Sequence, residues 1–151
     1  MAGPNTTFTS GNVFTAAQAN NFPRGLMAAP ATSTTSDTTI TTEEIMLTYT
    51  FNQVNGRSYL LQYFEPSLTS TAAGTLTARI TTGVAGTPYN SSTSPLAILT
   101  SNTALVTTVY TSGTSGSLTI YATLTASAGT ATASRSATRF PQLYAVDIGT
   151  L

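Results

Sequence analysis

Residues 45–65, IMLTYTFNQVNGRSYLLQYFE, decide which fold the sequence predicts. In the first half every second residue is large and apolar, and the residues between them include two threonines, a pattern typical of a strand with one buried face. The pair Asn55-Gly56 favours a tight turn, because both residue types tolerate positive φ angles. Residues 58–65 then carry apolar side chains on both faces. We therefore predict a β-hairpin whose second strand is central in its sheet or faces another subunit.

The same period of two continues along the rest of the chain. It predicts further strands near residues 75–81, 95–99, 105–110, 118–125 and 142–148, most of them separated by clusters of Gly, Ser and Thr. Threonine suits such strands, since its branched β-carbon fits a pleated surface and its hydroxyl stays hydrated. We predict an all-β domain over residues 37–151, a jelly-roll-like antiparallel β-sandwich of about eight strands.

Residues 1–36 follow another pattern and are predicted to form an N-terminal docking arm and linker. Thr15 can cap a short helix over residues 16–19, because its hydroxyl accepts a hydrogen bond from an amide of the first turn. Pro23 ends this helix, and Gly25 permits a change of direction. The stretch ATSTTSDTT at 31–39 is typical of a polar linker.

Composition excludes most familiar enzyme chemistry. Of the 151 residues, 34 are Thr and 16 are Ser, while only 7% are charged, against about 25% in an ordinary soluble domain. Cys, His, Lys and Trp are absent, which removes disulfides, imidazole and thiolate metal ligands, and Ser-His nucleophile pairs. We expect no cofactor, no metal ion and no enzymatic activity.

Charge and hydropathy limit the partners. The net charge is zero, and the five arginines form no concentrated basic face of the kind that binds nucleic acid. No apolar run approaches the roughly 20 residues that span a bilayer, and the N-terminus has no export-signal pattern. We therefore expect synthesis in a cytoplasm, with neither nucleic acid nor membrane as partner. So few charges, and no lysine on any strand edge, favour membership in an assembly.

Four charged residues are candidates for a functional site. Glu65 and Asp147 could act as a glycosidase-like pair only if the fold brought their carboxylates within about 5 to 9.5 Å. Arg135 and Arg139 are expected at the surface or between subunits. None of the four is predicted to be catalytic.

The aromatic residues are the other candidates for contacts. Tyr59, Leu61 and Tyr63 are predicted at a subunit interface, with the protein core as the alternative for the tyrosines. Tyr89, in the predicted loop GTPYNSS, is a possible outer-loop contact, because a tyrosine presents a rigid apolar body and a polar tip.

Three segments carry a resemblance to a known class of proteins: VFTAAQANNFPRGLMA at 13–28, FNQVNGRSYLLQYFEP at 51–66 and LYAVDIG at 143–149. In this order they resemble segments of small virion structural proteins of tailed bacteriophages, of the decoration, cement, minor tail or fibre type. The resemblance implies a jelly-roll-like domain that forms homotrimers in the virion and an N-terminal arm that attaches it to the particle. Two positions depart from the pattern of these virion proteins. Val146 stands where they often have a second acidic residue, directly before the aspartate, and Phe22 stands where a smaller aliphatic residue is common.

Under this resemblance the arm docks on the major capsid protein or another virion protein. The docking residues would be Phe14, Thr15, Asn20, Asn21, Phe22, Pro23, Arg24, Gly25 and Leu26. The leading hypothesis is a trimeric capsid decoration or cement protein. The alternative is a tail or head fibre whose loops at 82–94 and 111–117 bind a host surface glycan. A glycan-cleaving virion enzyme and a cellular adhesin domain are the two remaining alternatives.

Overall fold

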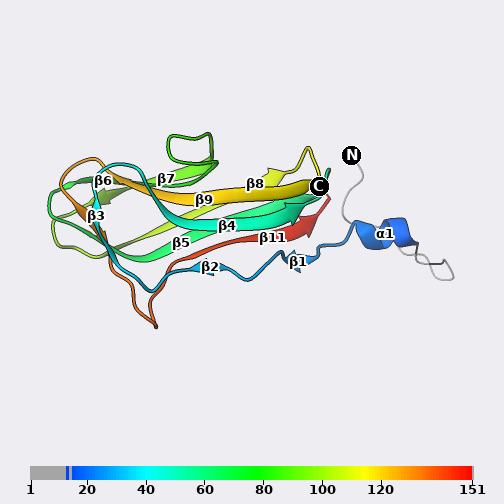
Figure 1. Cartoon of the computed structure of the whole chain (residues 1–151), viewed down its shortest axis with the longest axis horizontal. Coiled ribbons are helices and arrows are strands. Elements are labelled where there is room, and N and C mark those ends of the chain that lie inside the picture. Colours follow the sequence, from blue (N-terminus) through cyan, green and yellow to red (C-terminus); the bar gives the residue numbers. More distant parts are fainter. Residues whose placement is uncertain (1–12, 14, 151) are drawn as a thin grey trace.

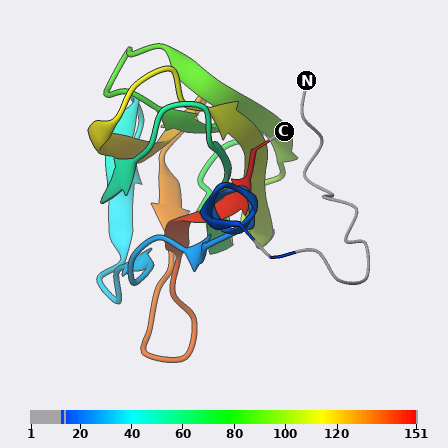
Figure 2. The same cartoon turned by 90° about the vertical axis from the view of Figure 1, so that its right-hand side faces the viewer.

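The computed structural model describes residue 13 and residues 15–150 and shows two antiparallel β-sheets packed face to face (Figures 1 and 2). The predicted fold class, a jelly-roll-like β-sandwich, is confirmed. One sheet has the order β1-β11-β5-β10-β3, with β2 also paired to β11 and β8 to β5, and the other has the order β4-β9-β6-β7. The elements are α1 (Ala16–Asn20), β1 (Gly25–Leu26), β2 (Ala31–Thr32), β3 (Asp37–Ile40), β4 (Glu44–Gln53), β5 (Ser58–Ser70), β6 (Gly74–Thr81), β7 (Pro88–Leu96), β8 (Asn102–Thr111), β9 (Gly116–Ala126), β10 (Ala131–Ala133) and β11 (Gln142–Gly149).

The strands β4 and β5 are where the sequence predicted them, but they do not form a hairpin. β4 pairs with β9 in the four-stranded sheet, whereas β5 is a central strand of the other sheet. The turn at Asn55-Gly56, with Gly56 at a φ of +78°, therefore connects the two sheets. The prediction of a paired hairpin was wrong, because a tight-turn signal does not specify which strands pair across it.

A second correction concerns β7, which was predicted as a loop at 82–94 followed by a strand at 95–99. β7 instead pairs with β6 from Pro88 to Leu96, and residues 97–101 form the connection to β8. Its side chains are mostly small and polar, so the strand has no apolar alternation to reveal it. It lies at the sheet edge, where prolines such as Pro88 and Pro95 are tolerated.

The core lies between the two sheets and is filled by every second side chain of the long strands. Tyr59, Leu61 and Tyr63 of β5 each have no exposed surface within the single chain. The prediction that these three residues form a subunit interface is therefore wrong, and the alternative, a place in the core, is correct for the tyrosines. Burial of an aromatic or leucine side chain contributes about 1.5 to 3 kcal/mol, so β5 is a main source of stability.

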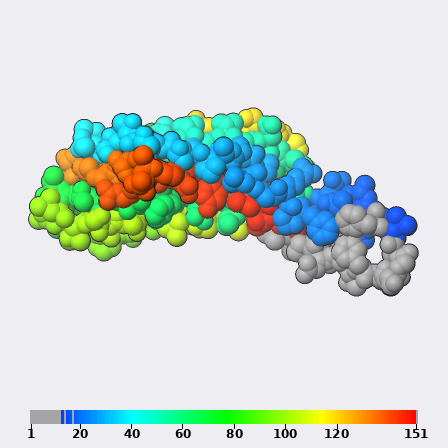
Figure 3. Space-filling view, turned by 90° about the horizontal axis from the view of Figure 1, so that it is seen from below, coloured from blue at the N-terminus to red at the C-terminus, as the bar shows by residue number. Residues whose placement is uncertain are grey.

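The first described residues lie at one end of the elongated sandwich, where α1 extends beyond the strands (Figure 1). The chain then returns along β11, and Figure 3 shows this blue segment beside the red strand. The seven-stranded sheet thus begins at Gly25, within the segment predicted as arm and linker. None of the described helices is long and apolar enough to cross a membrane.

Candidate functional site: the anchored N-terminal segment

The short helix α1 is stabilised by the residue that precedes it, Thr15, as the sequence predicted. The hydroxyl of Thr15 accepts a hydrogen bond from the Gln18 amide at 3.2 Å, and the Gln18 side chain accepts one from the Thr15 amide at 2.8 Å. These two bonds form a capping box, which satisfies amide groups that a helix start leaves without partners. The helix ends at Asn20, Asn21 is its C-cap, and Pro23 follows.

A buried ion pair fixes the chain directly after this helix. Arg57 Nε donates to Oδ2 of Asp147 at 2.5 Å, and Arg57 Nη2 donates to Oδ1 at 2.6 Å. Two further guanidinium hydrogens bind the arm: Nη1 donates to the carbonyl oxygen of Asn20, and Nη2 to that of Phe22 at 2.6 Å. We call this group of four residues the Arg57 clamp. The Arg57 and Asp147 side chains are only 4% and 0% exposed.

Backbone pairing continues the anchoring along β11. In β1, Gly25 is the register partner of Asp147 and Leu26 that of Val146. The Met27 amide then donates to the Ala145 carbonyl at 3.0 Å. The residues from 20 to 27 are thus attached to the sandwich through one buried charge pair and a short ladder of backbone hydrogen bonds.

Gly149 allows the arm to approach this closely. It has a φ of +95°, in the region that favours glycine. A Cβ atom added there would lie 2.7 Å from the Asn21 carbonyl oxygen. The Gly149 amide also donates to Oδ1 of Asp147 at 2.8 Å. The end of β11 is therefore shaped around the arm.

The arm is anchored by its backbone, while several apolar side chains remain at the surface. Val13 is 85% exposed, Phe22 37% and Leu26 51%. Pro23 and Arg24 are also exposed. Phe14, which was predicted as a docking residue, lies outside the described residues. The structure thus brings Asn20, Asn21, Phe22, Gly25 and Leu26 together at one end of the molecule; whether they dock on a partner stays a prediction.

The electrostatics of the clamp favour its charged form. Burial alone raises the pKa of Asp147, but hydrogen bonds from Arg57 and from the Gly149 and Arg24 amides outweigh burial and leave that pKa below its ordinary value of 3.8. The hydrogen bond and charge of Asp147 raise the pKa of Arg57. Both groups are therefore ionised at neutral pH.

Acid is expected to weaken the clamp. Because the folded-state pKa of Asp147 lies below 3.8, its contribution to stability is fully present above that pH and is lost as the pH falls toward the folded-state value. We expect the free energy of unfolding to fall between about pH 5 and pH 2. Denaturant unfolding of the native chain and of Asp147→Asn over this range measures the effect: the variant should show a shallower fall, and equal slopes would contradict the prediction.

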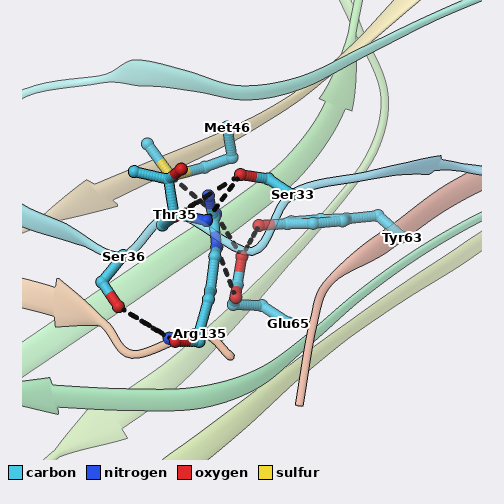
Figure 4. A network of polar contacts seen from close by, with 7 residues as sticks. All are labelled: Ser33, Thr35, Ser36, Met46, Tyr63, Glu65 and Arg135. Carbon is cyan, nitrogen blue, oxygen red and sulfur yellow. Dashed lines mark hydrogen bonds and ion pairs between the residues drawn. The ribbon is translucent and has the colours of Figure 1, made fainter. Parts of the chain in front are cut away.

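A second buried ion pair fixes the segment before β3 (Figure 4). Arg135 Nε and Nη2 donate to the two carboxylate oxygens of Glu65 at 3.1 and 2.6 Å, and the Tyr63 hydroxyl donates to Glu65 Oε2 at 3.0 Å. Arg135 Nη1 donates to the Thr35 carbonyl at 3.3 Å, and the Arg135 amide donates to Ser36 Oγ at 2.9 Å. We call these five residues the Arg135 clamp.

The Arg135 clamp corrects two expectations. Arg135 was expected at the surface or between subunits, but its side chain is only 4% exposed and is paired within the chain. The stretch at 31–39, expected as a linker, contributes β2 and the start of β3 and is held at Thr35 and Ser36. Arg139 is exposed, in a turn closed by backbone hydrogen bonds with Ser136.

Glu65 and Asp147 do not form a glycosidase-like pair. Asp147 is the register partner of Tyr59 in β5, and Glu65 is six residues farther along the same strand, which corresponds to about 20 Å. Each carboxylate is also paired with its own arginine. The distance required for hydrolysis, about 5 to 9.5 Å, is far exceeded.

Tyr89 lies in β7 and not in a loop. Its ring packs edge-on against Tyr110, with a distance of 5.1 Å between ring centroids, and it is half-buried. Burial raises the pKa of its hydroxyl. Glycan contact through Tyr89 stays a prediction, which binding of the isolated protein to a glycan array would test.

Arg57, Asp147 and Glu65 are the residues whose role the sequence reasoning missed. A signal was present: in β11 the inward positions run Leu143, Ala145, Asp147, so the strand period places this carboxylate inside. A buried carboxylate needs a cationic or hydrogen-bonding partner. In a chain with only five arginines, that requirement points to one of them.

Comparison with known proteins gives similarity of fold only. No model of a known protein family matches the sequence, and the search of curated proteins gives no match. A structure of the infectious bursal disease virus Gx strain matches 97% of this chain and 42% of its own, with 12% identity and a TM-score of 0.42. A structure from work on CBM4 structure and function matches 67% and 59%, with 11% identity and a TM-score of 0.37. An arabinose-bound α-L-arabinofuranosidase matches 88% and 24%, with 12% identity and a TM-score of 0.37.

This chain therefore spans at most 59% of the length of each of these three chains. Because β-sandwiches host many unrelated functions, similarities of this size do not assign one.

Proposed function

We propose that the chain is a structural protein of a bacteriophage particle, a trimeric capsid decoration or cement protein that binds the particle through its N-terminal arm. The proposal combines the resemblance of three sequence segments to small virion proteins with the structure of the arm. Its role is mechanical: the sandwich is a rigid body, and the arm is the part that binds.

One observation carries the proposal: the arm is anchored by its backbone and leaves apolar side chains exposed. The Arg57 clamp and β1 hold residues 20–27 on the sandwich, while Phe22 and Leu26 remain 37% and 51% exposed. A segment whose function was to complete the sandwich would turn these side chains inward. An anchored arm with outward apolar groups binds a partner at lower entropic cost than a free tail, because part of its chain is already ordered.

The energies suit attachment by several weak arms. Full burial of one large apolar side chain stabilises a complex by about 1.5 to 3 kcal/mol before ordering costs. Two or three such side chains per arm give modest affinity. Three arms linked in one trimer would raise the overall affinity by about 10² to 10⁴-fold through effective concentration, provided that all three reach their sites.

Deletion of residues 1–19 together with Phe22→Ser should abolish particle binding and keep the fold. All described strands begin at or after Gly25, so the deletion removes none of them. The assay is co-sedimentation of the purified protein with particles that lack it. These particles are produced from the same genome after deletion of the gene for this chain. We expect binding to fall by at least about 100-fold, as the apolar contacts of three arms are lost.

The matched control is Leu99→Ser. Leu99 is 78% exposed, and its amide donates to the Ser70 carbonyl, at the end of β5 opposite to the Arg57 clamp. The Leu99→Ser variant should bind particles like the native chain. Attachment through the arm would be rejected if the arm variant bound particles fully, or if the Leu99→Ser variant lost as much particle binding as the arm variant.

A further inference from the structure

The two outer faces of the sandwich differ in chemistry. On the four-stranded sheet the outward side chains are mainly threonine, serine and asparagine, and the hydroxyls of Thr50 and Thr119, for example, are hydrogen-bonded across strands at 2.8 Å. This face is polar and suits contact with water. The outer face of the seven-stranded sheet is less polar.

The outer face of the seven-stranded sheet carries rows of apolar side chains across neighbouring strands. The strand registers place Leu26, Val146, Leu60 and Val109 in one row over β1, β11, β5 and β8. Four positions farther along β5, Phe64 lies opposite Leu105 of β8. Leu105 and Val109 are 55% and 50% exposed, and Leu60, Phe64 and Val146 are half-buried. We call this surface the β5 outer face.

The β5 outer face is also without charge. Between the two apolar rows lie Tyr144, Gln62 and Thr107, which are neutral. The remaining outward positions of β5, β8 and β11 are likewise neutral: Pro66, Thr69, Thr103, Thr111, Gln142 and Ile148. Three copies can therefore pack around a common axis through this face without like charges meeting at the contacts.

The size of the face supplies a large part of what a subunit interface needs. The three long strands β11, β5 and β8, at a spacing of about 4.8 Å and over about ten residues at about 3.3 Å each, give roughly 480 Å² in projection, before the relief of the side chains is counted. A standard stable interface buries about 800 Å² on each partner. Monomeric proteins rarely expose a contiguous apolar patch of more than a few hundred Å².

We propose that copies of this chain associate through the β5 outer face, with a second copy as the occupant. The proposal rests on the trimer of the proposed function and specifies its interface. Leu105, Val109, Phe64 and Leu60 form the centre of the contact. The threonine-rich face of the other sheet then remains toward solvent.

The test is the mass in solution of the full chain and of two matched double variants. Leu105→Glu/Val109→Glu places two charges on the β5 outer face. Thr48→Glu/Asn52→Glu places two charges with the same spacing on β4, at exposed positions of the polar face. Sedimentation velocity at tens of micromolar should give the native chain and the β4 variant as trimers of the 15.6 kDa protomer. The Leu105/Val109 variant should be monomeric, with association weakened by at least about 100-fold.

Three results would overturn the inference: a monomeric native chain, a Leu105/Val109 variant that keeps the native mass, or dissociation of both variants alike. Circular dichroism checks that each variant is folded, and Leu105→Thr/Val109→Thr, which preserves strand propensity, should still weaken association. Particle binding is measured separately by co-sedimentation. If the native chain is a trimer that does not bind particles, the proposed function is rejected and this interface is kept. If the Leu105/Val109 variant is still a trimer and the native chain binds particles, this interface is rejected and the proposed function is kept.

Discussion

Asp147→Asn is expected to lower the free energy of unfolding by about 3 to 5 kcal/mol, the usual cost of leaving one charge of a buried pair without its partner. Asparagine keeps the size of the side chain, so the loss comes from the uncompensated Arg57 guanidinium and not from a cavity. Chemical denaturation measures it. The control is Arg79→Met, which removes the more exposed pair with Glu43 at 3.4 Å and should cost less than about 1 kcal/mol. A smaller loss in Asp147→Asn than in the control would contradict the role of the clamp.

The same variant should release the arm. In the native chain the Asn20 and Phe22 carbonyls are held by Arg57, and the Arg24 amide by Asp147. Arg24 itself is exposed, so trypsin can cleave after it once the backbone detaches. Mass spectrometry of a limited digest should show faster release of residues 1–24 from Asp147→Asn. An unchanged rate would mean that the clamp does not hold the arm.

Glu65→Gln is expected to destabilise the protein by a similar amount, about 3 to 5 kcal/mol, without releasing the arm. The Glu65 carboxylate has no exposed surface and accepts hydrogen bonds from Tyr63 and from two Arg135 nitrogens. Burial and the negative charge of Glu65 raise the pKa of Tyr63 well above its usual value, so the Tyr63 hydroxyl remains a donor. Glutamine leaves the buried Arg135 charge without its anion. Urea or guanidinium unfolding gives the loss of stability.

A comparison of Asp147→Asn with Glu65→Gln separates the loss of folding stability from the release of the arm. Glu65→Gln affects the segment at Thr35 and Ser36 (Figure 4). Arg24 precedes β1, which pairs beside Asp147, about 20 Å along β5 from Glu65. Cleavage after Arg24 in the native state should therefore remain slow. A double variant, Glu65→Leu/Arg135→Met, should be less destabilised than Glu65→Gln, because it leaves no buried charge unpaired. Rapid cleavage after Arg24 in Glu65→Gln would mean that release follows general loss of stability.

The sequence predicted elements whose signals are local. Thr15 and Gln18 form the expected cap because both partners lie within one turn. The alternation at Leu76, Ala78 and Ile80 identifies β6 because these residues face the core. β7 was missed because its serines and threonines face water or a neighbouring strand on both sides.

The clamps could not be found from local patterns. Arg57 and Asp147 are 90 residues apart, and Arg135 and Glu65 are 70 residues apart. Which strands become neighbours decides which charges meet, and the turn at Asn55-Gly56 was assigned to the wrong strand pairing. The alternation along each strand predicts that Glu65 and Asp147 face inward. Which arginine pairs with each carboxylate depends on which strands are neighbours, and the sequence alone does not give that topology.

The position of β11 has a consequence for biosynthesis. It is the last described strand to leave the ribosome, yet it supplies Asp147 and the backbone groups that hold the first strand, β1. A nascent chain that has not yet reached Asp147 cannot form the Arg57 pair, and its leading segment has no strand on which to lie. Prematurely terminated copies would carry a loose leading segment and lose the preordering that favours attachment. Under the proposed function, incorporation into a particle would select for copies whose translation has reached the end of this strand.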